Sequence, residues 1–119
     1  MKTILIVDDD AEIRKLEKII LSKEGFAVIE AEDGASALEI AKMNMPDLII
    51  SDVMMENING FMLYEFLRDD PKTAKIPMIL VTGEAQAAGA WNMDPHIGYL
   101  QKPVSPHDLL AAVKKRIAK

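Results

Sequence analysis

The sequence contains no cysteine, which excludes disulfide bonds, thiolate metal sites and cysteine nucleophiles. Aromatic residues make up only 5% of it, and no apolar run approaches the roughly 18 residues that a membrane-spanning helix needs. The N-terminus does not resemble a signal peptide, because only Lys2 and a short apolar run precede three aspartates. These absences lead us to expect a soluble cytoplasmic protein without a membrane segment.

Negative charge exceeds positive charge, and histidine is scarce. The net charge of −5 disfavours a general nucleic-acid surface, because neutralising phosphates takes a positive face. The two histidines, His96 and His107, lie far apart in the sequence, which disfavours a histidine-based metal site. A chain of 119 residues can bury one hydrophobic core but is too short for two, so we expect a single domain over residues 1–119.

Five short apolar segments predict β-strands. Three of them are nearly continuous apolar runs, which are typical of strands buried on both faces: Thr3–Val7, Leu48–Ile50 and Met78–Val81. Two weaker segments, Ala27–Glu30 and Ile97–Leu100, are expected at the edges of the sheet.

Segments with helical periodicity separate these strands. Apolar residues recur three or four positions apart in the first, third and last helical segments, at Ile13, Leu16 and Ile20, at Leu63, Phe66 and Leu67, and at Leu109, Leu110, Val113 and Ile117. Ser105 and Pro106 predict the N-cap and the first residue of the last helix. Asp70 and Pro71 predict the end of the third helix.

The alternation of strands and helices predicts an α/β fold with a five-stranded parallel sheet and helices on both faces. With the three apolar strands in the centre and the two weaker ones at the edges, the strand order 2-1-3-4-5 fits. This is the known order of flavodoxin-like folds, in which ligands bind beyond the carboxyl ends of the strands, between the first and the third.

Residues suited to phosphate chemistry follow four of the five strands, and in each case the first of them lies within two positions of the predicted strand end. They are Asp8, Asp9 and Asp10 after the first strand, Asp52 after the third, Thr82 after the fourth, and Lys102 with Pro103 after the fifth. Because the carboxyl ends of parallel strands share one edge of the sheet, we expect these residues to converge there.

Such a gathering of carboxylates needs a cation. Adjacent strands lie about 4.8 Å apart, so Asp8 and Asp9 should be near Asp52, and two unit charges about 4 Å apart repel by about 4 kcal/mol at an effective dielectric near 20. Oxygen donors without histidine or cysteine favour Mg²⁺ over zinc or copper. A carboxylate can form an aspartyl phosphate, and Thr82 and Lys102 can hold phosphate oxygens. The residues therefore predict a phosphoryl-accepting site.

Each of these residues alone has a simpler interpretation. An aspartate after a strand often caps a helix, and Asp9 with Glu12 resembles a capping box. Thr82 alone is consistent with an ordinary loop hydroxyl, Lys102 with a solvated lysine, and Tyr99 with a side chain that packs at a sheet edge. Only the joint placement after four strands favours a site.

Four segments, in order, resemble the receiver domains of two-component response regulators: ILIVDDDAEIRK, PDLIISDVMMENINGF, IPMILVTGEA and YLQKPVSPHDLL. The resemblance covers essentially the whole chain and implies the flavodoxin-like receiver fold. It also implies that Asp8 and Asp9 hold Mg²⁺, directly or through water, and that Asp52 is phosphorylated. The backbone carbonyl of Met54 is then expected to complete the shell of the metal.

The resemblance further implies a conformational switch. Thr82 and Lys102 are expected to engage the phosphoryl group, and Tyr99 matches the aromatic residue that moves inward when the threonine turns toward the phosphate. The peptide bond between Lys102 and Pro103 is expected to be cis.

The implied partners are a sensor histidine kinase or a histidine phosphotransfer protein as donor, and a downstream effector or fused output domain as target. Direct contact with nucleic acid or membrane is not expected. A receiver domain assists its own phosphorylation and dephosphorylation, but it is not a dedicated turnover enzyme.

The chain departs from the family pattern at a few positions. Glu56 stands where proline is usual, Asn59 where aspartate is common, and Gly83 where alanine commonly follows the threonine. From Thr82 to Lys102 there are 102 − 82 = 20 positions, about two fewer than the family pattern leads us to expect. The segment between them contains two glycines, so we predict a short or irregular fourth helix. The sequence therefore does not assign the surface that contacts an output partner.

Two other functions remain to be weighed. An aspartate-nucleophile phosphatase of the haloacid dehalogenase type would use the D-x-D spacing of Asp8 and Asp10, but Ala11 and Glu12 replace the expected glycine and threonine, and Asp52 would have no role. The other candidate is a receiver-shaped interaction module that is not phosphorylated, and the intact set of polar residues disfavours it.

Overall fold

The computed structural model describes residues 1–83 and 97–117. Within these residues, five strands form one sheet, and every neighbouring pair of strands is parallel. They are β1 (Thr3–Val7), β2 (Ala27–Ala31), β3 (Leu48–Asp52), β4 (Met78–Thr82) and β5 (Ile97–Gln101). Their order is β2-β1-β3-β4-β5, which confirms the predicted order and the places of the two weaker strands at the edges.

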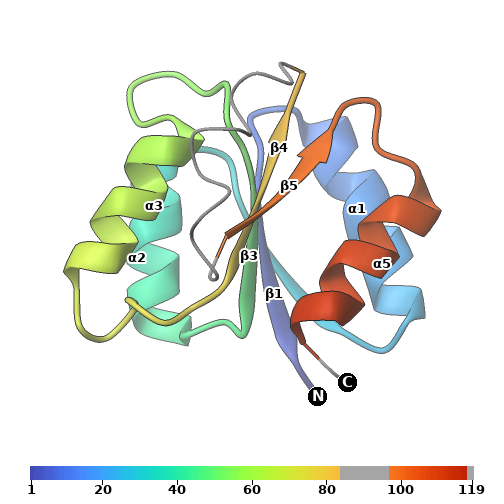
Figure 1. Cartoon of the computed structure of the whole chain (residues 1–119), viewed down its shortest axis with the longest axis horizontal. Helices are drawn as coiled ribbons and strands as arrows, with labels where there is room; N and C mark the ends of the chain where they lie inside the picture. Colours follow the sequence, from blue (N-terminus) through green and yellow to red (C-terminus); the bar gives the residue numbers. More distant parts are fainter. Residues whose placement is uncertain (84–96, 118–119) are drawn as a thin grey trace.

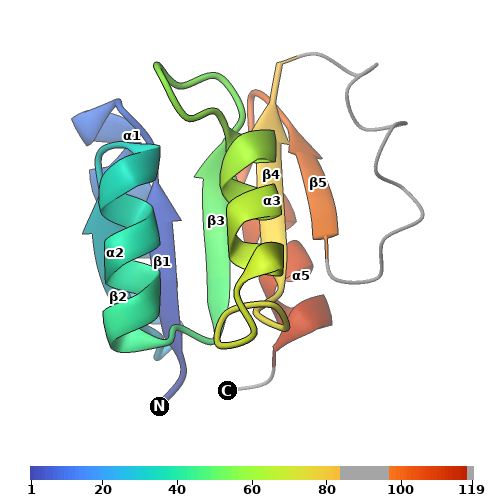
Figure 2. The same ribbon diagram turned by 90° about the vertical axis from the view of Figure 1, so that its left-hand side faces the viewer.

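Helices cover both faces of the sheet (Figure 1). In the described residues they are α1 (Ala11–Lys23), α2 (Gly34–Asn44), α3 (Gly60–Asp69) and α5 (Pro106–Arg116). The helices α2 and α3 lie on one face, seen from the front in Figure 2, and α1 and α5 lie on the other. None of the helices in this part of the chain is long and apolar enough to cross a membrane. The segment predicted to form a short fourth helix lies outside the described residues.

The three central strands are buried because both of their faces are apolar. Side chains alternate between the two faces of a strand. On β1, for example, Leu5 belongs to the apolar cluster under α2 and α3, and Ile4 and Ile6 belong to the cluster under α1 and α5. All three are fully buried. The sheet is therefore held between two separate apolar layers.

The side of α1 that faces the sheet differs from the predicted one. Leu16 was expected in the buried stripe but is 57% exposed, and the buried residues of the helix are Glu17 and Leu21. Successive helical residues are about 100° apart around the axis. A helix that turns Glu17 and Leu21 inward therefore carries Leu16 out toward solvent.

The prediction for α3 was correct at Leu63 and Leu67, which are buried, but wrong at Phe66, which is 45% exposed. Tyr64 takes its place in the core at 3% exposure. It shares a buried cluster with Ala37 of α2.

Capping residues define where the helices begin. The Asp10 carboxylate caps α1 by accepting from the backbone N–H groups of Glu12 and Ile13, so the capping box suggested for Asp9 is wrong. Ser105 caps α5 as predicted, and α3 ends at Asp69, directly before the Asp70-Pro71 pair. Asn59, one of the departures from the family pattern, caps α3 through its side-chain oxygen.

Candidate functional site

Three carboxylates gather at the carboxyl edge of the sheet. Because β1 pairs with β3, Asp8 directly after β1 lies beside Asp52 at the end of β3. One oxygen from each of Asp8, Asp9 and Asp52 lies within 4.8 Å of the other two. Asp8 and Asp52 are 4% and 5% exposed, and Asp9 is open to solvent. The structure therefore brings the three predicted acidic residues together.

Asp52 is held between an ammonium group and a backbone amide. Lys102 Nζ lies 3.0 Å from one carboxylate oxygen, and the N–H of Met54 donates to the other oxygen at 3.3 Å. Burial disfavours the charged form of Lys102, but the hydrogen bond and the charge of Asp52 raise the pKa of this lysine above its ordinary value. The raised pKa keeps the ammonium group of Lys102 charged beside Asp52.

The surroundings of Asp8 disfavour the charged form of its carboxyl. Burial raises the pKa of its carboxyl to about 6, and the charges of Asp52 and Asp9 act in the same direction. The N–H of Asp10 donates to Asp8 Oδ1 at 2.9 Å and partly opposes this effect, as does the charge of Lys102. A divalent cation among the three carboxylates would relieve this cost, and an all-oxygen donor set is what Mg²⁺ prefers.

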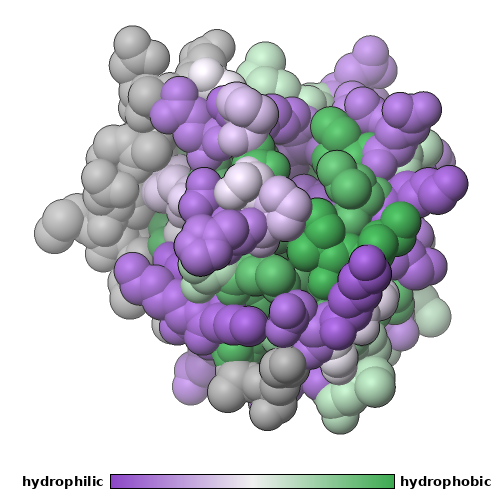
Figure 3. All heavy atoms as spheres, turned by 90° about the vertical axis from the view of Figure 1, so that its right-hand side faces the viewer, coloured by the Kyte–Doolittle hydropathy of each residue, from purple (hydrophilic) through white to green (hydrophobic). Residues whose placement is uncertain are grey.

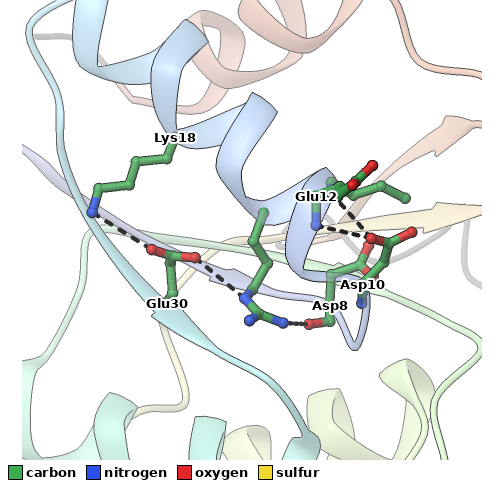
Figure 4. A network of polar contacts seen from close by, with 7 residues as sticks. Asp8, Asp10, Glu12, Lys18 and Glu30 are labelled. Atoms are coloured by element: carbon green, nitrogen blue, oxygen red, sulfur yellow. Dashed lines mark hydrogen bonds and ion pairs between the residues drawn. The ribbon is translucent and has the colours of Figure 1, made fainter.

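A polar network fixes the loop that carries the acidic pair (Figure 4). Arg14 of α1 donates from Nη1 to the backbone carbonyl of Asp8 at 2.6 Å and from Nε to Glu30 at 3.2 Å. Lys18 pairs with the second oxygen of Glu30 at 3.5 Å. Because Glu30 belongs to β2, Arg14 ties the loop after β1 to the neighbouring strand. Sequence reasoning missed Arg14, since the contact depends on how α1 is turned about its axis, which periodicity alone does not predict.

Thr82 and Tyr99 lie on the two strands beyond Asp52. Thr82 ends β4 at 2% exposure, and its carbonyl accepts from the backbone N–H of Lys102 at 2.9 Å. Asp52 pairs with Val81, which places Thr82 next to the acceptor strand. Tyr99 pairs with Leu80 and packs, half-buried, against the apolar cluster under α2 and α3.

Backbone geometry shapes the rim of the site. The peptide bond between Lys102 and Pro103 is cis. Gly60 approaches the acceptor strand so closely that an added Cβ would lie 2.7 Å from the Asp52 carbonyl oxygen. Among the described residues, a Cβ at Gly83 would meet nothing within 4 Å.

A further carboxylate that sequence reasoning missed lies behind the site. Glu17 of α1 is only 9% exposed. Burial, together with the charge of Asp8, raises the pKa of the Glu17 carboxyl to about 7. Its spacing of four residues from both Ile13 and Leu21 was the available signal, since it places Glu17 on their side of the helix.

Residues 4–114 match the family model described as the response regulator receiver domain. The chain belongs to this family. Receiver domains are the phosphorelay signalling modules of two-component systems rather than a family of dedicated enzymes, which disfavours the phosphatase alternative. They bind Mg²⁺ at an acidic pocket, and the three aspartates of this receiver could hold such an ion.

Similar proteins include receivers of different lengths. Protein PilH of Pseudomonas aeruginosa is 36% identical, and the match covers 99% of both chains. The DNA-binding dual master transcriptional regulator RpaA of a Synechocystis strain is also 36% identical, over 96% of this receiver and 48% of the regulator. The receiver spans about half the length of several curated regulators that it matches.

Solved structures show the same architecture. The chemotaxis protein CheY4 of Vibrio cholerae superposes with a TM-score of 0.89 at 30% identity, over 98% of this receiver and 99% of that chain. The receiver domain of the hybrid histidine kinase CckA superposes with a TM-score of 0.82 at 30% identity, over 98% and 99% of the two chains. These similarities confirm the predicted receiver fold.

Proposed function

We propose that residues 1–119 form one receiver domain in which Asp52 accepts a phosphoryl group in a Mg²⁺-dependent reaction. The donor is a phosphorylated histidine of a sensor histidine kinase or a histidine phosphotransfer protein. The main support is the position of Asp52: a buried carboxylate with a lysine on one oxygen and two further carboxylates within 4.8 Å.

The metal would be held by carboxylate oxygens of Asp8, Asp9 and Asp52. The backbone carbonyl of Met54 is the fourth ligand that the family resemblance suggests. When bound, Mg²⁺ supplies positive charge that neutralises the oxygens of the phosphoryl group.

The transfer itself needs few protein groups. A carboxylate oxygen of Asp52 attacks phosphorus, the P–N bond to the donor imidazole breaks, and a P–O bond forms. The imidazole nitrogen keeps the bonding electron pair and takes up a proton. Lys102, already 3.0 Å from Asp52, is in place to move with the negative charge to the phosphoryl oxygens.

The conformational response begins at the ends of β4 and β5. Thr82 turns its hydroxyl toward the new phosphoryl group, and Tyr99 moves into the space that the threonine leaves. A phosphoryl group changes the relative stability of two existing conformations, and a partner or fused output domain that prefers one of them responds.

Intact-mass measurement after treatment with acetyl phosphate and Mg²⁺ tests the acceptor. The unmodified protein should gain the mass of one phosphoryl group, and Asp52→Asn should gain none. Asp69→Asn, which changes an exposed aspartate at the far end of α3, should label like the unmodified protein. Equal labelling of Asp52→Asn would contradict the assignment. No labelling of any of the three proteins would favour the non-phosphorylated interaction module.

A further inference from the structure

A groove on the face of the molecule that carries α1 and α5 leads to the functional site. Its volume is about 430 Å³. Figure 3 shows this face, on which apolar side chains (green) gather between charged ones. Most of the residues that line the groove are apolar, and three are charged: Asp8 and Lys102 of the site, and Glu17 of α1. A buried carboxylate of the helix and the lysine of the site thus border the same space.

Lys102 and Glu17 carry opposite charges. In the structure the ammonium group contacts Asp52, with Nζ 3.0 Å from Oδ2. The Lys102 side chain is 36% exposed, so this contact does not enclose it. Burial raises the pKa of the Glu17 carboxyl to about 7, and the charge of Lys102 opposes this rise. The ammonium group is therefore close enough to act on Glu17 while it is bound to Asp52.

The contact between Lys102 and Asp52 is weakened when Mg²⁺ binds at the acidic edge. The ammonium group would share the carboxylate of Asp52 with the ion, because Asp52 belongs to the group of three carboxylates that could hold it. Two cations on one carboxylate repel each other. Neutralised by the ion, Asp52 also attracts the ammonium group less. Lys102 then needs another anion within reach of its side chain.

We propose that Glu17 is a positioning residue, which receives the ammonium group of Lys102 when Mg²⁺ occupies the acidic edge. The lysine side chain is flexible, and its backbone stays fixed because its N–H is bound to the Thr82 carbonyl. An ion pair with Lys102 compensates the burial of Glu17, which is 9% exposed. A phosphoryl group on Asp52 then draws the ammonium group back. The proposal rests on the Mg²⁺ site of the proposed function.

Proton contacts in the unmodified protein test this movement directly. The measurement is made near pH 8, above the pKa of about 7 of the Glu17 carboxyl, so that this group is ionised. Nuclear Overhauser effects between the Lys102 Hε and the Glu17 Hγ protons report the distance between the two side chains. We expect these effects to become stronger as Mg²⁺ is added up to saturation. Effects that stay unchanged or become weaker would contradict the proposal.

Calorimetric titration with Mg²⁺ measures what the new contact contributes. Glu17→Gln keeps the shape of the side chain but loses its charge, and the Kd for Mg²⁺ should rise by about fivefold, which is the value of a partly exposed ion pair. Glu12→Gln removes an exposed charge from the same helix. This control should change the Kd by less than about twofold, because solvent and salt screen that charge.

The same titration in a Lys102→Met background separates an effect through Lys102 from a direct effect of Glu17 on the ion. Because no ammonium group is left to receive, Glu17→Gln should then change the Kd by less than about twofold. An equal rise with and without Lys102 would show that Glu17 acts on the ion directly, and the proposal would be wrong. The proton contacts are measured on the unmodified protein, so the test does not depend on how any variant folds.

The outcomes also separate this proposal from the function proposed for Asp52. If Glu17→Gln binds Mg²⁺ like the unmodified protein, and acetyl phosphate still labels Asp52, only the role of Glu17 is wrong. If the unmodified protein does not bind Mg²⁺, both proposals are wrong.

Discussion

Asp52 and Glu17 are both buried carboxylates, at 5% and 9% exposure, but their surroundings differ. Asp52 lies at the carboxyl edge of the sheet, where it contacts an ammonium group and a backbone amide. Glu17 lies on a helix that faces the sheet, among apolar residues and without such contacts in the described part of the chain. Edges where strands end supply backbone donors and side chains from several strands, whereas the inner face of a helix supplies mainly apolar neighbours.

Removal of the Lys102 ammonium group should leave Asp52, like Glu17, without a cationic partner. Lys102→Met leaves three carboxylates at the edge without their ammonium group, and we expect the free energy of unfolding without Mg²⁺ to fall by about 2 kcal/mol, because the lysine is partly exposed to solvent. Added Mg²⁺ should restore part of the loss, because it supplies the missing positive charge. Urea unfolding with and without Mg²⁺ measures both effects. Lys75→Met, at an exposed position, is the control and should change little.

Removal of the Glu17 charge should have the opposite effect. The pKa of about 7 in the folded protein lies above the ordinary value of 4.5, so the folded state binds the proton more tightly than the unfolded state does. Wild-type stability therefore falls as pH rises from 4.5 to 7. Glu17→Gln lacks this loss and should be more stable by about 2 kcal/mol above pH 7, with no advantage below pH 4.5.

Urea unfolding across this pH range, without Mg²⁺, tests the prediction for Glu17. The charged groups that act on its carboxyl are Asp8, Asp52 and Lys102. All three are present in both proteins, so their own titration largely cancels in the comparison. A stability difference that does not vary with pH would show that Glu17 titrates normally.

The contacts of Arg14 with the loop after β1 predict a smaller effect. Arg14→Lys keeps the positive charge but loses the planar group that contacts Asp8 and Glu30 together. Since residues that orient metal ligands affect affinity, the Kd for Mg²⁺ should rise by about tenfold in calorimetric titration. Lys18→Arg, which alters only the outer ion pair of Glu30, should bind Mg²⁺ almost normally. Equal losses in both variants would mean that Arg14 has no particular role.

The smallest effect on stability is expected on the exposed side of α1. Leu16 is 57% exposed, so Leu16→Ser should change the free energy of unfolding by less than about 0.5 kcal/mol. Thermal unfolding measures this change. A large loss of stability would mean that Leu16 is packed more tightly than its exposure indicates.

The sheet and the acidic edge were predictable because they depend on strand ends. Once the apolar runs fix the strand order, parallel strands must bring Asp8, Asp9 and Asp52 to the same edge, whatever the details of packing. Helix orientation is different. Periodicity predicts that a segment is helical, but the neighbours decide how far the helix turns about its axis, so Leu16 and Phe66 were placed wrongly and Glu17 was missed.

Local loop geometry also could not be predicted from the sequence. Asp9 and Asp10 are adjacent aspartates before a helix, and the conformation of one residue decides which of them caps it. The structure assigns the cap to Asp10, which leaves Asp9 available beside Asp8. Likewise, Arg14 and Glu30 are 16 residues apart and meet because β2 pairs with β1.

Lys102 contacts two strand ends through different parts of the same residue. Its backbone N–H is bound to the carbonyl of Thr82, while its ammonium group reaches Asp52. The side chain can therefore exchange one anionic partner for another while the main chain keeps its pairing with β4. In the phosphoryl transfer that we propose, a change at the end of β3 would thus reach β5 through this one residue while the strands keep their pairing.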